Sequence, residues 1–234
     1  SSSSSSSSSS SFSSRILLDR LIDQHKLHHL SFSSSSSSPS LSPVLVSGAS
    51  SPLLVAVDCG AAPGGWTKLL AESGCCETVF AVDPADIPLI DDHVASTLGN
   101  RILSKNSGSD AKFAAEPDYE HDGGVMVHLR CKIQDAILRF QKNSIRADVW
   151  VSDMCLQEME AQHDIFASAL AAGVVSRGAL VVLTLKCTKG HSKESFDAQA
   201  AQEVARLETL LKDVRVLHLM SNRSGERTVV GFVE

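Results

Sequence analysis

The chain has 234 residues, of which 43% are hydrophobic, enough for one domain with a substantial core. Its net charge is −6 and no stretch approaches the roughly 20 apolar residues of a membrane-spanning helix, so an integral helical membrane protein is excluded and RNA contact requires a local basic patch. The six cysteines show neither a CxxC pair nor zinc-site spacing, which favours reduced thiols in an intracellular protein and predicts no metal site.

The first 43 residues form a serine-rich leader. Serine tracts bury too little apolar surface to offset chain entropy, so we expect most of residues 1–43 to remain outside the fold. Apolar residues at helical spacing predict one amphipathic helix over residues 15–30. The leader also resembles an organellar transit peptide, although Asp19 and Asp23 count against this interpretation. We therefore expect a cytoplasmic or nuclear protein, or an organellar one if the leader is a transit peptide.

From residue 44 onward, strand and helix patterns alternate. The expected strands cover residues 53–57, 78–82, 125–129, 147–152, 179–185, 214–217 and 227–233. The expected helices cover residues 67–73, 134–141, 161–175 and 198–212, and a loop is expected over 104–123. This order predicts an α/β fold for residues 44–234, with a doubly wound, Rossmann-like sheet that is mostly parallel and has an antiparallel C-terminal edge.

A glycine-rich string over residues 58–66, Asp-Cys-Gly-Ala-Ala-Pro-Gly-Gly-Trp, follows the first expected strand. Open α/β sheets bind ligands at the carboxyl ends of their strands, and glycines let a ligand approach the backbone closely. Asp83 ends the second expected strand, where a carboxylate can accept hydrogen bonds from ribose hydroxyls. The alternatives are a purely structural glycine turn and a turn residue before Pro84. Together the two features favour a nucleoside-containing cofactor.

The string at residues 58–66 resembles the S-adenosylmethionine loop of the FtsJ-type RNA ribose 2′-O-methyltransferases. Three further segments are similar to that family in the expected order: Val-Ser-Asp-Met at 151–154, the strand at 178–186 that ends in lysine, and Asn-Arg-Ser-Gly-Glu-Arg-Thr at 222–228. The resemblance covers about residues 50–234. It implies S-adenosylmethionine as cofactor and RNA, ribosomal RNA foremost, as substrate.

Within the family, the segments over residues 128–130 and before Lys186 are most similar to the branch that methylates a cytidine in bacterial large-subunit rRNA. The resemblance also implies which residues contact the cofactor. These are Asp58, Gly60, Ala61, Pro63, Gly64, Gly65, Trp66, Asp83 and Asp153.

The family implies a Lys–Asp–Lys–Glu tetrad, of which three members have counterparts here. A ribose 2′-hydroxyl is a poor nucleophile, so Lys186 is expected to act as its base, while Asp153 orients the lysine. Glu226 is expected to fix a second cationic group or the target ribose. Each also has a structural alternative: a helix cap for Asp153, a solvated strand-end charge for Lys186, and an ion pair with Arg223 or Arg227 for Glu226.

Several positions depart from the family pattern. Where its first lysine is expected, the chain offers Asp19 in strict register or Arg20 after a one-residue shift. Arginine remains protonated and cannot act as a base. Lys68 is expected to face solvent, Cys155 replaces the usual proline after the Ser-Asp-Met segment, and Asp135 substitutes weakly for the acidic residue that contacts adenine.

We expect RNA to bind a basic patch at the same edge of the sheet as the cofactor. Its members are Lys186, Lys189, His191, Lys193, Arg223 and Arg227. We also expect the protein to be a monomer.

Two other functions remain open. A catalytically silent, methyltransferase-like RNA-binding or ribosome-assembly factor would share every motif, whereas a nicotinamide-dependent dehydrogenase would need the Gly-x-Gly-x-x-Gly string that this loop lacks.

Overall fold

The computed structural model describes residues 54–73, 75–88, 102–105, 125–187, 192–219 and 221–234. The predicted helix over residues 15–30, with Asp19 and Arg20, lies outside the described residues. The same holds for Lys189 and His191 of the predicted basic patch.

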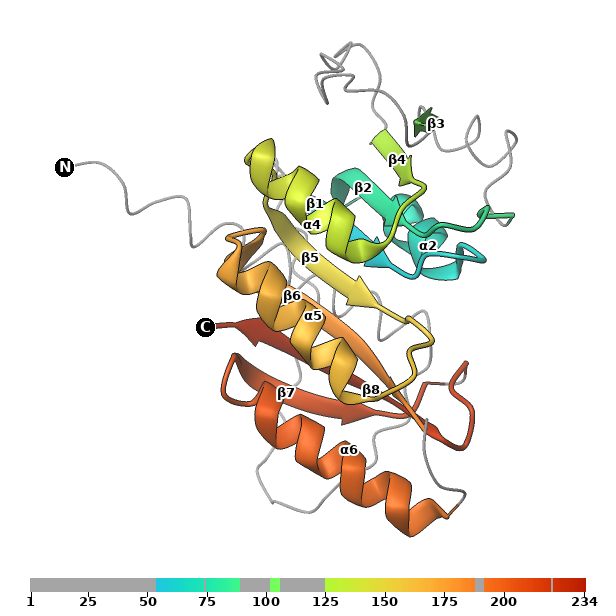
Figure 1. The fold of residues 1–234 in the computed structure, drawn as a ribbon, viewed down its shortest axis with the longest axis vertical. Coiled ribbons are helices and arrows are strands. Elements are labelled where there is room, and N and C mark those ends of the chain that lie inside the picture. Colours follow the sequence, from blue (N-terminus) through green and yellow to red (C-terminus); the bar gives the residue numbers. More distant parts are fainter. Residues whose placement is uncertain (1–53, 74, 89–101, 106–124, 188–191, 220) are drawn as a thin grey trace, which may run out of the picture.

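Eight strands form one sheet in the order β3-β4-β2-β1-β5-β6-β8-β7 (Figure 1). They are β1 (Leu54–Cys59), β2 (Cys76–Val82), β3 (Ile102–Lys105), β4 (Val125–Leu129), β5 (Ala147–Ser152), β6 (Val175–Lys186), β7 (Leu211–Leu217) and β8 (Glu226–Val233). All neighbours from β3 to β6 pair in parallel, whereas β8 is antiparallel to both β6 and β7. The predicted α/β fold, with a mostly parallel sheet and an antiparallel C-terminal edge, is confirmed.

Four described helices cover the two faces of this sheet: α2 (Gly65–Glu72), α4 (Ile133–Lys142), α5 (Glu160–Ala171) and α6 (Lys193–Leu207). Helices α4, α5 and α6 lie over one face, where Trp150 and Phe166 belong to the larger apolar core (Figure 1). Helix α2 covers the other face, where Leu70 packs with Val149 and Val151. Neighbouring residues of β5 thus face opposite cores, which explains the continuous apolar runs of the central strands. None of the described helices combines the length and the hydrophobicity that a membrane span requires.

The predicted helix over residues 198–212 is wrong at both ends. Helix α6 begins at Lys193 because the Ser192 hydroxyl accepts a hydrogen bond from the Ser195 N–H at 3.1 Å, which caps the first turn. The helix ends at Leu207, and β7 begins at Leu211, where pairing with β8 replaces helical hydrogen bonds.

Other predicted boundaries also differ from the structure. Helix α5 ends at Ala171, because β6 begins at Val175, four residues before the predicted start of this strand. The pairing between β5 and β6 is irregular here, since the partner shifts from Val175 to Leu180 over two residues of β5. The predicted loop over residues 104–123 is wrong at its first two residues, which belong to β3.

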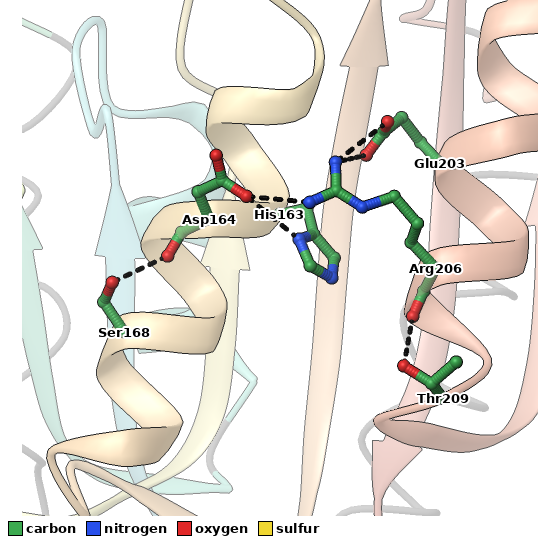
Figure 2. Close-up of polar contacts among 6 residues, drawn as sticks. All are labelled: His163, Asp164, Ser168, Glu203, Arg206 and Thr209. Atoms are coloured by element: carbon green, nitrogen blue, oxygen red, sulfur yellow. Dashed lines mark hydrogen bonds and ion pairs between the residues drawn. The ribbon is translucent and has the colours of Figure 1, made fainter.

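Helices α5 and α6 are joined by a charged network (Figure 2). The Arg206 guanidinium donates to Asp164 Oδ1 at 2.9 Å and to both carboxylate oxygens of Glu203 at 3.2 Å. His163 Nδ1 lies 3.3 Å from the same oxygen of Asp164. The hydrogen bonds from His163 and Arg206 hold the pKa of Asp164 below its ordinary value. The network fixes α5 relative to α6 over the sheet.

Candidate functional site

The candidate site lies at the carboxyl ends of the central strands. Strands β1, β2 and β5 end at the same level, because Cys59 pairs with Val82 of β2 and with Ser152 of β5. The side chains that follow these strands, together with Lys186 at the end of β6, therefore come to one edge of the sheet. This is the edge at which open α/β sheets bind ligands.

The glycine loop after β1 packs tightly against two neighbouring segments. The Gly60 N–H donates to the Val82 carbonyl of β2 at 2.9 Å. Gly60 and Gly64 have φ angles of 77° and 115°, a region that L side chains rarely adopt. A Cβ atom at Gly65, by contrast, would meet no atom of the described part of the chain within 4 Å. The first two glycines are therefore required by the backbone, whereas Gly65 borders open space at the start of α2.

Asp58 is fully buried at the end of β1. Its Oδ2 accepts a hydrogen bond from the Thr67 hydroxyl at 2.6 Å, while its Oδ1 has no hydrogen-bond partner among the described residues. Burial foremost, with smaller contributions from the charges of Asp153 and Asp83, raises the pKa of Asp58 to about 7, although the hydrogen bonds from Thr67 lower it. A buried acceptor without a partner is rare in folded proteins and marks Asp58 as a candidate ligand-binding group.

Asp83 joins the glycine loop to the turn after β2. Its Oδ2 accepts from the Ala62 N–H at 3.2 Å, and its Oδ1 accepts from the Ala85 N–H at 2.7 Å. His128 Nε2 lies 3.1 Å from the Asp83 carbonyl, and so links the ends of β2 and β4. Asp83 is therefore a turn residue, as the alternative interpretation held. Its two oxygens still have lone pairs for further donors.

Asp153 and Lys186 are in direct contact. Lys186 Nζ lies 3.0 Å from Asp153 Oδ1 and donates to the Asp153 carbonyl at 2.8 Å. The Asp153 N–H donates to the Cys59 carbonyl at 3.1 Å, which ties the pair to the end of β1. The Lys186 side chain is only 20% exposed, so it is no solvated strand-end charge. Asp153 is no helix cap either, because the N-cap of α5 is Met159.

Glu226 lies directly opposite Lys186 in the antiparallel ladder between β6 and β8. Its Oε2 accepts a hydrogen bond from the Arg223 N–H at 2.9 Å, so the carboxylate closes the turn before β8. The alternative interpretation expected an ion pair between the Glu226 carboxylate and Arg223 or Arg227. Both contacts instead involve the main chain, because Arg223 donates its backbone N–H and the Arg227 guanidinium donates to the Glu226 carbonyl at 2.7 Å. Glu226 is thus a neighbour of the Asp153–Lys186 contact, and its carboxylate holds the turn.

Part of the predicted basic patch makes contacts within the protein itself. Arg227 is only 14% exposed, its guanidinium lies over the Phe196 ring at 5.3 Å, and one of its nitrogens is 3.7 Å from Asp197. It also lies 3.2 Å from His218 Nδ1. Arg227 therefore joins β8 to α6. Lys193 is 75% exposed and pairs with Asp197 at 2.7 Å, so it remains at the surface.

The other departures from the family pattern lie at the surface. Lys68 faces solvent as predicted, with a 3.8 Å ion pair to Glu72 of the same helix. Asp135 is exposed in the first turn of α4, and Cys155 is an exposed free thiol beside Met154. None of these three contacts the Asp153–Lys186 pair through a hydrogen bond that the described structure contains.

Gln162 of α5 was missed by the sequence analysis. It is only 3% exposed, and its amide contacts the segments on both sides of the site. Within the sequence it reads as one more polar helix residue, between Ala161 and His163. Only its position among the neighbouring elements reveals that it faces inward.

Two solved structures are among those to which this chain is similar. Fibrillarin in complex with Nop5p is 13% identical, with a TM-score of 0.52, and the match covers 77% of this chain and 73% of that one. A fibrillarin from Methanococcus jannaschii, described as a pre-rRNA processing protein, is 15% identical with a TM-score of 0.49, and the match covers 78% and 67% of the two chains. At these identities the likeness to the first structure shows the fold alone.

The sequence itself identifies the family more directly. No curated protein sequence matches the chain significantly. The family model of FtsJ-like methyltransferases matches residues 45–221, which is more than half of the chain and includes the glycine loop, Asp83, Asp153 and Lys186. The chain therefore belongs to the FtsJ-like methyltransferase family and is an S-adenosylmethionine-dependent methyltransferase.

Proposed function

We propose that this protein methylates a ribose 2′-hydroxyl of RNA, with residues 44–234 as its methyltransferase domain. The observation that supports this proposal is the contact between Asp153 and Lys186 beside the glycine loop. A lysine held by a carboxylate at the ligand-binding edge of the sheet is suited to proton transfer. Membership of the FtsJ-like family supports RNA as the substrate, and ribosomal RNA is the RNA that we propose.

The described residues fit S-adenosylmethionine, which when bound supplies an electrophilic methyl group on a sulfonium. Asp58 offers a buried oxygen without a partner, which suits an ammonium group. Gly65 borders open space at the N-terminus of α2, where helix N–H groups favour a carboxylate. The Asp83 carboxylate retains acceptor capacity for ribose hydroxyls. We propose further cofactor contacts from Gly60, Ala61, Pro63, Gly64, Trp66 and Asp153.

Lys186 acts as the base in this proposal. As a neutral amine it has two N–H groups, which match the two Asp153 oxygens that it contacts, and one lone pair. The lone pair would accept the proton of the ribose 2′-hydroxyl as its oxygen bonds to the methyl carbon, while the bond from that carbon to the cofactor's sulfur breaks and the neutral thioether leaves. Asp153 orients the amine before transfer and stabilises the ammonium that results. Glu226, next to Lys186 in the ladder, fixes the turn that faces the target ribose.

The experiment that tests this function combines the protein with labelled S-adenosylmethionine and total RNA. Nuclease mapping then locates the label. Label on a ribose 2′-oxygen supports the proposal, and its loss in a Lys186→Ala variant assigns the transfer to this site. Tight binding of RNA without any transfer of label would instead favour the catalytically silent binding or assembly factor.

A further inference from the structure

Gln162 is a buried amide with hydrogen bonds on both of its ends. Its Nε2 donates to the Met154 carbonyl and to the Thr184 carbonyl, each at 3.1 Å. Its Oε1 accepts a hydrogen bond from the Ser152 hydroxyl. Both N–H groups and the carbonyl oxygen of the amide are therefore used.

These contacts surround the Asp153–Lys186 pair. Ser152 and Met154 are the residues on either side of Asp153, and Thr184 lies two residues before Lys186 on β6. We propose that Gln162 is a positioning residue. It holds the ends of β5 and β6 at the separation that lets Lys186 Nζ contact Asp153. This inference rests on the proposed function, because it names the residue that sets the geometry of the proposed base.

The chemistry of the amide explains why glutamine suits this position. The ends of β5 and β6 present two carbonyl oxygens toward α5, and only a side chain with two donors on one atom satisfies both. The hydroxyl of Ser152 supplies the donor that the amide oxygen needs. A glutamate would place a buried carboxylate against two carbonyls, and a methionine would leave all three groups without partners.

The helix that carries Gln162 is itself fixed from its outer side. The next two residues, His163 and Asp164, belong to the network that Arg206 forms between α5 and α6 (Figure 2). Phe166 on the buried side packs near Trp150, with ring centroids 6.4 Å apart. Gln162 therefore reaches the site from a helix that is held at both faces, as a positioning residue requires.

The test uses Gln162→Met, which keeps the length of the side chain and removes its hydrogen bonds. Phe166→Leu is the matched control, because it weakens α5 packing without removing any of the three hydrogen bonds of Gln162. The first measurement needs no catalysis. The protein is treated with a trace of acetic anhydride, and mass spectrometry compares acetylation of Lys186 with that of Lys142, an exposed lysine on α4.

In Gln162→Met we expect Lys186 to be acetylated severalfold faster relative to Lys142, because the Lys186 amine no longer stays in contact with Asp153. Turnover of RNA should fall by about 10–100-fold, since a displacement of about 1 Å can cost that much. The affinity for S-adenosylmethionine should change much less. Phe166→Leu should lower the melting temperature while leaving acetylation of Lys186 and turnover near the wild-type values.

Two results would overturn the inference. One is wild-type acetylation and turnover in folded Gln162→Met. The other is an equal change in Phe166→Leu at a matched loss of stability, which would show a purely structural role. If Gln162→Met does not fold, Gln162→Asn gives the same readouts, because its amide is one methylene too short to reach both carbonyls. If the wild-type protein transfers no methyl group to RNA, the proposed function fails, and acetylation alone decides whether Gln162 positions Lys186.

Discussion

Gly60 packs so closely against Met154 that a Cβ atom at this glycine would lie 2.7 Å from Met154 Cγ and 3.0 Å from its Cα. The glycine loop and the segment that carries Asp153 are therefore in contact through their main chains. Any change in the position of one segment is passed to the other. We therefore expect the glycine loop and the segment with the Asp153–Lys186 pair to shift together, as one unit.

Gly60→Ala should damage both halves of this unit. The new methyl group collides with the main chain of Met154, and the positive φ angle adds about 1–2 kcal/mol of strain. We expect a lower melting temperature and weaker binding of S-adenosylmethionine. Gly65→Ala is the matched control, because its Cβ would meet none of the described residues within 4 Å. It should keep wild-type stability, and calorimetry should show weaker cofactor binding only.

Asp58 should make the protein less stable as the pH rises. Burial raises its pKa to about 7 from the ordinary value of 3.8, so between these two pH values the folded state keeps a proton that the unfolded state releases. Stability from this group therefore falls through that window, by a total on the order of 4 kcal/mol above pH 7. Denaturation of the wild type and Asp58→Asn at pH 5 and pH 8 measures the effect.

The Asp58→Asn variant keeps an acceptor for Thr67 and cannot ionise. Its stability relative to wild type should therefore be greater at pH 8 than at pH 5. An equal difference at both pH values would show that Asp58 does not titrate in this window. Binding of S-adenosylmethionine should weaken in the variant if the Oδ1 of Asp58 is a cofactor contact.

Asp83→Ala should weaken binding of S-adenosylmethionine by roughly 1–3 kcal/mol, the usual cost of leaving hydrogen-bonding groups without a partner. The change removes the acceptor for ribose hydroxyls and also the link from Ala62 to Ala85. Asp86→Ala is a suitable control, since this exposed carboxylate in the same turn pairs with Arg130 instead. Unchanged affinity in Asp83→Ala, measured by calorimetry, would remove Asp83 from the cofactor site.

Lys186→Ala should abolish turnover while leaving cofactor affinity nearly intact. Lys186→Arg should fail almost as badly, because a guanidinium keeps its proton at working pH. Loss of a general base typically costs about 10²–10⁴-fold in rate, which single-turnover kinetics can resolve. Lys142→Ala on the exposed face of α4 serves as the control. Full activity of the Arg variant would mean that Lys186 only contacts phosphate and that another group is the base.

Much of the fold is predictable because the central strands are buried on both faces. The apolar runs of β1, β5 and β6 have few other interpretations, and the string over residues 58–66 places the cofactor edge directly after one of them. The end of α6 could not be predicted in this way. Leu207, Leu210 and Leu211 continue a helical spacing, and only the available edge of β8 draws Leu211 into a strand.

The buried polar side chains around the site could not be predicted from the sequence either. Gln162 and Arg227 have the side chains of surface residues, yet one is buried between two strand ends and the other lies over Phe196. Local pattern assigns such residues to solvent, because exposure is their usual state. Their roles follow from partners that are distant in the chain and meet only in the folded protein.

The place of β8 in the sheet has a kinetic consequence. This strand follows β7 in the chain but lies between β6 and β7 in the sheet. Strand β7 therefore cannot join the sheet until β8 has inserted beside β6, and Lys186 has no ladder partner before that step. Long-range pairing of this kind is slow, and until it occurs β6 presents an open hydrogen-bonding edge. A chain in which β8 has not yet paired with β6 should therefore lack the ladder partner of Lys186 and be most prone to aggregate along β6.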